Sequence, residues 1–105
     1  MVRGGDKTPL LKKMEDSKMK ISNIIGNSGQ PVKNQFLIVD DNGNRYFQSY
    51  DSIIAKIENG KTYSDSVYWD YSQTTGKNRN IFLGEDKKTT EKKIKSGEYT
   101  LTNLN

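Results

Sequence analysis

Two aspartates are the best candidates for acid-base chemistry in this sequence. The 105-residue chain contains no Cys and no His, so it lacks a thiolate nucleophile, the commonest zinc ligands and the commonest general base. Paired carboxylates catalyse hydrolysis when burial raises the pKa of one of them, and Asp65 and Asp70 lie close together among tyrosines. On a strand, however, their odd spacing places them on opposite faces, and Asp70 also suits a helix start. We therefore predict no catalytic residue and no enzymatic activity.

The string DDNGNR resembles a calcium-binding loop. Asp40, Asn42, Asn44 and Asp51 fall at ligand positions of such a loop. Arg45 then occupies the position that requires Gly, and an Asp stands where the bidentate Glu belongs. Asn-Gly between two apolar runs is instead the strongest short-range signal for a β-hairpin. We predict a turn here, with no metal site and no cofactor.

Positive side chains gather near the C-terminal end and form the first candidate binding surface. Residues 77–95 contain seven basic and three acidic side chains, which gives this segment a net charge of +4. The net charge of the whole chain is also +4. Helix N-terminal amides next to Thr hydroxyls and lysines can hold phosphates. The alternative is a solvated charged helix with ordinary i,i+4 pairs such as Glu91 and Lys95. The predicted nucleic-acid contacts are Lys77, Arg79, Lys87, Lys88, Lys92, Lys93 and Lys95.

A surplus of tyrosines forms the second candidate surface. Tyr and Trp are favoured anchors of protein interfaces, and residues 40–70 carry six acidic and three basic side chains. A protein-binding module that inhibits a host or defence-system protein is therefore the alternative function. In the simpler interpretation, these rings cover an undersized core. The predicted interface residues are Tyr46, Tyr50, Tyr63, Tyr68 and Tyr71.

A small α+β domain must position these side chains. Nine of the ten aromatic residues lie between Gln35 and Leu83, so this stretch contains the core. Strand-like runs and Asn-Gly turns predict an antiparallel sheet of about four strands followed by two short helices. The strands are expected at about 32–40, 45–50, 53–58 and 61–69, and the helices at about 73–83 and 87–96.

For three other segments, the spacing of apolar residues gives a weaker prediction of secondary structure. The spacing of Ile21, Ile24 and Ile25 predicts a short helical turn. Residues 53–57 fit a strand or a helical turn, and their β-branched side chains favour the strand. Residues 99–104 are expected as a short strand or an extended tail. We expect Trp69 at the centre of the core, together with largely buried Phe36, Ile38, Phe47, Ile54, Phe82 and Leu83.

Composition indicates one small domain, at residues 19–105. Only 31% of the chain is hydrophobic, which indicates a thin core. Residues 1–18 combine Gly-Gly, a Pro and mixed charge, and we interpret them as a disordered tail or as a non-native extension, with translation starting at Met19. No run is long and apolar enough to span a bilayer or to act as a secretory signal. We expect no membrane association and a cytoplasmic location, while the pattern says nothing about oligomeric state.

Three strings resemble a known group of proteins: YFQSYDSIIAKI (residues 46–57), WDYSQTTGKNRNIFL (residues 69–83) and KKIKSGEY (residues 92–99). They are similar to small uncharacterised proteins encoded by phages and mobile elements of low-GC bacteria, a group without a known activity. The resemblance implies an accessory protein that acts inside a bacterial host by binding nucleic acid, a host protein or a defence system. It assigns no functional residue.

Overall fold

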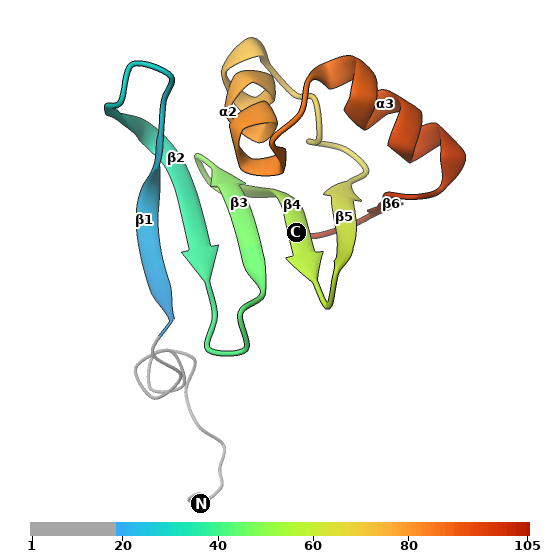
Figure 1. The fold of residues 1–105 in the computed structure, drawn as a ribbon, viewed down its shortest axis with the longest axis horizontal. Helices are drawn as coiled ribbons and strands as arrows, with labels where there is room; N and C mark the ends of the chain where they lie inside the picture. The colour runs from blue at the N-terminus through green and yellow to red at the C-terminus, as the bar shows by residue number, and fades with distance from the viewer. Residues whose placement is uncertain (1–18) are drawn as a thin grey trace, which may run out of the picture.

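The computed structural model describes residues 19–105, which form a six-stranded sheet and two helices (Figure 1). The strands lie in the sheet in sequence order; the first five are antiparallel neighbours, and the sixth pairs parallel to the fifth. The elements are β1 (Lys20–Ile25), β2 (Pro31–Val39), β3 (Arg45–Ser49), β4 (Ser52–Glu58), β5 (Lys61–Asp65), α2 (Gln73–Leu83), α3 (Lys87–Ser96) and β6 (Thr100–Thr102). The α+β class and the order of sheet before helices are therefore correct, whereas the expectation for residues 1–18 lies outside the described residues.

The predicted four-stranded sheet is incomplete, because it omits β1; of the two alternatives expected for residues 99–104, the short strand is present as β6. The helical turn expected from Ile21, Ile24 and Ile25 is wrong: these residues lie in β1, which pairs with β2. Pairing with an existing strand satisfies the backbone of this short segment, and a bulge after Asn23 lets Ile24 reach the core. A segment of six residues is too short for helical spacing alone to decide its structure.

Strand β5 ends at Asp65, four residues before the predicted end at Trp69. The Asp65 carboxylate accepts hydrogen bonds from the backbone N–H groups of Val67 and Tyr68, at 3.0 and 2.8 Å. The Trp69 N–H donates to the Asp65 carbonyl at 3.1 Å. These bonds turn the chain away from the sheet, so Trp69 lies in a loop.

The predicted turns and helix ends are confirmed. The β2–β3 turn contains Asn42-Gly43, with Gly43 at a φ of 84° and the Asp40 carboxylate accepting from the N–H groups of Asn42 and Asn44. Ser72 caps the start of α2. Asp86 caps the start of α3. The predicted limits of both helices agree with the observed ones.

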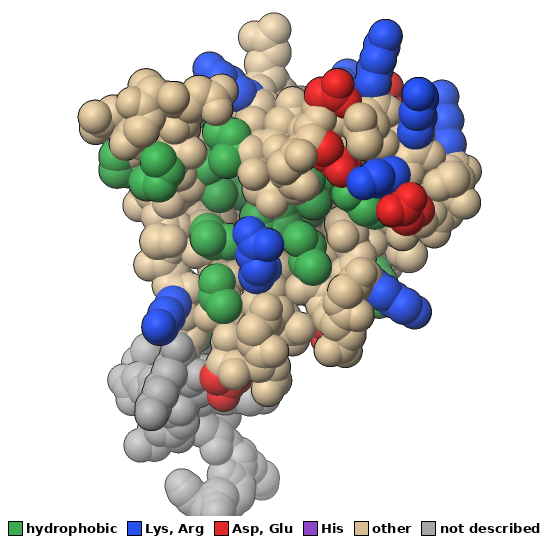
Figure 2. All heavy atoms as spheres, viewed as in Figure 1, with side chains coloured by type: hydrophobic (Ala, Val, Ile, Leu, Met, Phe, Trp, Pro, Cys, Tyr) green, Lys and Arg blue, Asp and Glu red, His purple; other side chains and the backbone are tan. Residues whose placement is uncertain are grey.

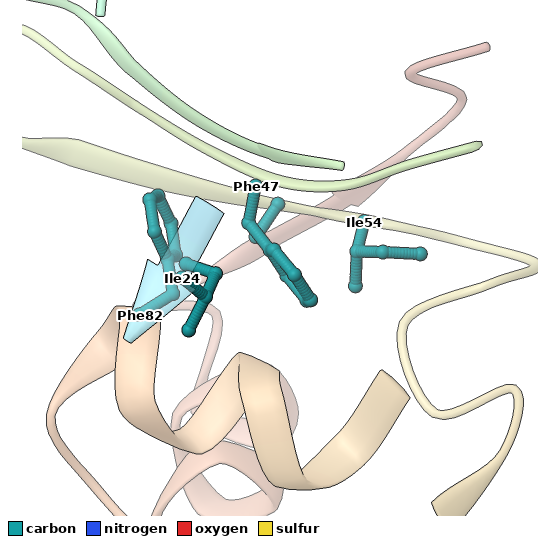
Figure 3. Close-up of a cluster of buried hydrophobic side chains, with 5 residues drawn as sticks. Ile24, Phe47, Ile54 and Phe82 are labelled. Atoms are coloured by element: carbon teal, nitrogen blue, oxygen red, sulfur yellow. The ribbon is translucent and has the colours of Figure 1, made fainter. Parts of the chain in front are cut away.

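The core lies between the sheet and α2 (Figure 3). Phe47 is completely buried, is flanked in register by Leu37 and Ala55, and stacks on Phe82 with ring centroids 5.9 Å apart. The prediction of buried side chains is confirmed for Phe47, Ile54 and Phe82. The other four residues, Phe36, Ile38, Trp69 and Leu83, are only partly buried. Trp69 lies outside the core cluster, so its predicted central position is wrong.

The other side of the sheet forms what we call the open face. Successive strand residues point to opposite sides, so the neighbours of Leu37 and Phe47 face away from the core. A row of paired residues crosses five strands there: Ile21, Ile38, Tyr46, Lys56 and Tyr63. Because no described helix packs on this side, Phe36 and Ile38 keep part of their surface exposed.

Gln35 is buried on the core side of β2 with an unpaired amide. It has 0% exposed surface, and neither side-chain polar atom has a hydrogen-bond partner within residues 19–105. A buried unpaired amide costs about 1 to 3 kcal/mol. We therefore expect Gln35→Met, which keeps the side-chain length, to raise the unfolding free energy by about 1 to 2 kcal/mol. Urea unfolding measures this, with exposed Gln73→Met as the matched control; a lower midpoint for Gln35→Met would show that the amide is paired in solution.

Candidate nucleic-acid interface

The Glu85 carboxylate, which is mostly buried, ties the residues on either side of helix α3 to the helix itself. This carboxylate accepts hydrogen bonds from Thr90 Oγ1 at 2.6 Å, Lys93 Nζ at 2.9 Å and Tyr99 OH at 2.9 Å. Burial raises the pKa of Glu85, but these three hydrogen bonds outweigh it, and the pKa lies below its ordinary value. Lys93 is thus committed to an internal ion pair, although it belongs to the predicted contact set.

The outer face of α3 presents three lysines in a row. Lys88, Lys92 and Lys95 are exposed and follow one another at spacings of four and three residues, which places them on the same side of the helix. None of them forms an ion pair with a residue in the range 19–105. Glu91 lies beside them as the one acidic side chain between Lys87 and Ser96. In Figure 2, basic side chains (blue) gather over α3, with acidic side chains (red) among them.

Arg79 is buried, in contrast to the predicted role as a phosphate contact. Its side chain is 1% exposed, and its guanidinium donates to the Trp69 carbonyl at 2.7 Å and to Asp70 at 3.0 Å. The guanidinium also lies over the Trp69 ring, 5.1 Å from the centroid. A Cβ at Gly76 would lie 3.3 Å from Asp70 Oδ1, so Gly76 leaves room for the Arg79–Asp70 pair. Arg79 therefore ties the loop before α2 to the helix.

Asp70 also binds Lys87, and together with Lys77 these residues line a basic groove. Lys87 Nζ lies 2.7 Å from Asp70 Oδ2. Burial raises the pKa of Asp70, but Lys87 and Arg79 lower it more, and the net pKa is below the ordinary value. The groove has a volume of 380 Å³ and runs beside the first turn of α2. Lys77 is exposed in it.

The two aspartates considered for acid-base chemistry are engaged separately. Asp65 binds four N–H donors near the end of β5, whereas Asp70 binds the two cations beside α2. Both carboxyl pKa values are lowered, which is the opposite of what a general acid needs. Within the described part of the chain, no group of three or more His, Cys, Asp or Glu residues is arranged to hold a metal.

The five predicted interface tyrosines separate into two sets. Tyr46 and Tyr63 lie on the open face, where Lys56 packs 5.0 Å from the centre of the Tyr63 ring. Tyr50, Tyr68 and Tyr71 line a pocket between the β3–β4 turn and the start of α2. The sequence contains no signal that separates the tyrosines into these two sets. Tyr50 and Tyr68 line the same pocket because the chain turns after Asp65.

The fold and its charged surface define a class: a small α+β protein in which one helix, α2, packs on a mixed six-stranded sheet and a basic helix, α3, follows it. Residues 19–98 match the family described as "Family of unknown function (DUF8033)", and the chain belongs to this family. No curated protein and no solved structure matches the chain. Within residues 19–105, no helix is long and apolar enough to cross a membrane.

Proposed function

We propose that this protein is a non-enzymatic accessory protein of a phage or mobile element that binds nucleic acid without sequence specificity inside the bacterial host. The origin is supported by the sequence resemblance, and the binding by the row of Lys88, Lys92 and Lys95 on α3. These lysines have no acidic partner in the described residues, while the neighbouring carboxylates of Asp70 and Glu85 already bind other cations. Their charges are therefore available to neutralise phosphates and release counterions.

The arrangement favours phosphate contacts over base recognition. Lysine carries a point charge and lacks the planar, forked donor group with which arginine recognises bases. The Arg79 guanidinium has such a group, but it is buried and therefore not available to a base. Lys77 extends the lysine surface toward the start of α2, where backbone N–H groups also attract anions. We call Lys77, Lys88, Lys92 and Lys95 the basic surface.

The proposal is tested by replacing the lysine row. In fluorescence anisotropy with labelled DNA and RNA, the triple variant Lys88→Gln, Lys92→Gln, Lys95→Gln should bind more weakly to all sequences. The slope of log affinity against log salt should fall by about 0.7 to 0.9 for each phosphate that the variant no longer neutralises. The matched control is the triple variant Lys20→Gln, Lys33→Gln, Lys61→Gln, which removes the same charge from exposed positions on β1, β2 and β5.

Equal loss in both triple variants would show that only net charge matters and would contradict a defined basic surface. No binding by the unmodified protein at low salt, where electrostatic attraction is strongest, would leave the second candidate function. That function is inhibition of a host or defence-system protein, and the groove of 390 Å³ on the open face, lined by Ile38, Tyr46 and Leu104 among others, favours it. A pull-down from host lysate would then be the next measurement.

A further inference from the structure

A tyrosine-lined pocket lies on the other side of the first turn of α2 from the basic groove. It has a volume of 350 Å³ and is formed by the β3–β4 turn and the segment that leads into α2. The side chains that matter for its chemistry are those of Ser49, Tyr50, Asp51, Tyr68, Tyr71 and Thr75.

The rings in this pocket are exposed to an unusual degree. Tyr71 is 71% exposed and Tyr50 is 53% exposed. Tyr68 is half-buried beneath Tyr71 and meets it edge to face, with centroids 5.4 Å apart. The exposed ring surfaces of Tyr50 and Tyr71 are thus available for contact with a planar group, and every base has a face that can stack.

Tyr50 is held in its position at a conformational cost. Its φ is 54°, in the left-handed region that a bulky residue rarely adopts. The Tyr50 N–H donates to the Asn34 carbonyl at 2.8 Å, and Gln48 Nε2 donates to the Tyr50 carbonyl at 2.7 Å. Gly adopts this backbone conformation without strain. The presence of Tyr at this position therefore points to a role for its ring.

The pocket also offers a hydrogen-bond donor and an acceptor. Ser72 Oγ donates to Thr75 Oγ1, and Thr75 Oγ1 shares a hydrogen bond with Ser49 Oγ. These three hydroxyls have three hydrogens and only two mutual hydrogen bonds, so one hydrogen on Ser49 or Thr75 has no acceptor among residues 19–105. Asp51 supplies a carboxylate that makes no ion pair with the described residues.

We propose that this pocket binds one unpaired base of a single-stranded nucleic acid whose phosphates lie on the basic surface; the inference rests on the proposed function. The base stacks on Tyr71 and Tyr50. An N–H group on its edge donates to Asp51, and an acceptor on the same edge takes the free hydroxyl hydrogen of Ser49 or Thr75. A paired base cannot enter, because its edge is already bonded and its faces are stacked. The protein therefore prefers single strands to duplexes.

The test compares a labelled single-stranded oligonucleotide of mixed sequence with the duplex of the same sequence. Tyr71→Ala should weaken single-strand binding about 5- to 150-fold, the effect of removing the ring on which one base stacks. It should change duplex affinity less than about two-fold and leave the salt slope unchanged, because no charge is removed. Tyr50→Gly should also weaken single-strand binding while melting no lower than the unmodified protein, since Gly adopts this φ without strain. Val67→Ala is the matched control: Val67 is 70% exposed in the same loop and does not line the pocket.

Each result decides between the two proposals. Loss of single-strand preference in both tyrosine variants, with the Val67→Ala variant unchanged, supports the base pocket. Unchanged single-strand affinity in the tyrosine variants, or an equal loss on duplex, overturns the base pocket but leaves binding by the lysine row intact. Absence of binding by the unmodified protein overturns the proposed function and the pocket with it.

Discussion

Replacement of Phe47 by alanine should lower the free energy of unfolding by about 3 to 5 kcal/mol, which is the usual cost of removing a large buried ring. Phe47 is fully buried, has core neighbours on both adjacent strands and stacks on Phe82 of α2. It joins the sheet to the helix, so the cavity is not easily filled by a local shift. A domain of this size has a total stability of about 5 to 15 kcal/mol. Urea unfolding followed by circular dichroism should therefore show that the variant has lost a large part of its stability.

Trp69→Ala is the informative comparison, because the sequence pattern predicts Trp69 at the centre of the core. The structure places its ring at the surface of the loop, half-buried against the Arg79 guanidinium. Loss of this cation–π interaction and of partial burial should cost only about 1 to 3 kcal/mol. If Trp69→Ala proved more destabilising than Phe47→Ala, our description of the core would be wrong.

The parts of the fold that the sequence predicted well are those with a local physical cause. Ser72 and Asp86 offer capping oxygens, and Gly84 and Gly97 adopt the left-handed conformation that ends a helix. Each signal acts within a few residues of the element that it limits. Both helices could therefore be placed from the sequence alone.

The parts that the sequence predicted poorly depend on distant partners. The helical spacing in β1 is real, but the segment gains more by pairing with β2. Strand β6 exists because Tyr63 and Thr100 come together after two intervening helices. No local pattern specifies such a parallel pair, since the two strands are joined by a long crossover.

The candidate sites show the same division. The sequence predicted the helix that carries Lys88, Lys92 and Lys95, but it did not separate these lysines from Lys87 and Lys93, which the fold pairs with Asp70 and Glu85. Arg79 likewise looked like one more cation in a basic stretch, and only the fold shows it enclosed by Trp69 and Asp70. A small residue one turn earlier, Gly76, is the local sign that a bulky group packs against this part of α2.

The second large effect is expected at Asp65. This carboxylate is 1% exposed and accepts four hydrogen bonds: from the N–H groups of Val67 and Tyr68 at one oxygen, and from the Leu104 N–H and the Asn105 amide at the other. It thus fixes the chain after β5 and the C-terminal segment after β6. Asp65→Asn keeps the shape but places an amide N–H₂ opposite N–H donors. We expect a loss of about 2 to 5 kcal/mol in a urea titration at neutral pH.

The pH dependence provides a check that does not rely on the size of this loss. Burial raises the pKa of Asp65, but the hydrogen bonds from Leu104, Tyr68, Val67 and Asn105 outweigh it, so the folded-state pKa lies below the ordinary value of 3.8. A group whose pKa is lowered by folding stabilises the protein above its unfolded-state pKa, and this contribution is lost as the pH falls through the folded-state pKa. The pKa values of Asp40, Asp70, Glu85 and Asp86 are lowered too, but these groups are present in both proteins and cancel in the difference between them. The difference in melting temperature between the two proteins should therefore be constant from neutral pH down to about pH 5 and shrink below it. A difference that stays constant to the lowest pH at which both proteins fold would mean that Asp65 acts through its shape and not through its charge.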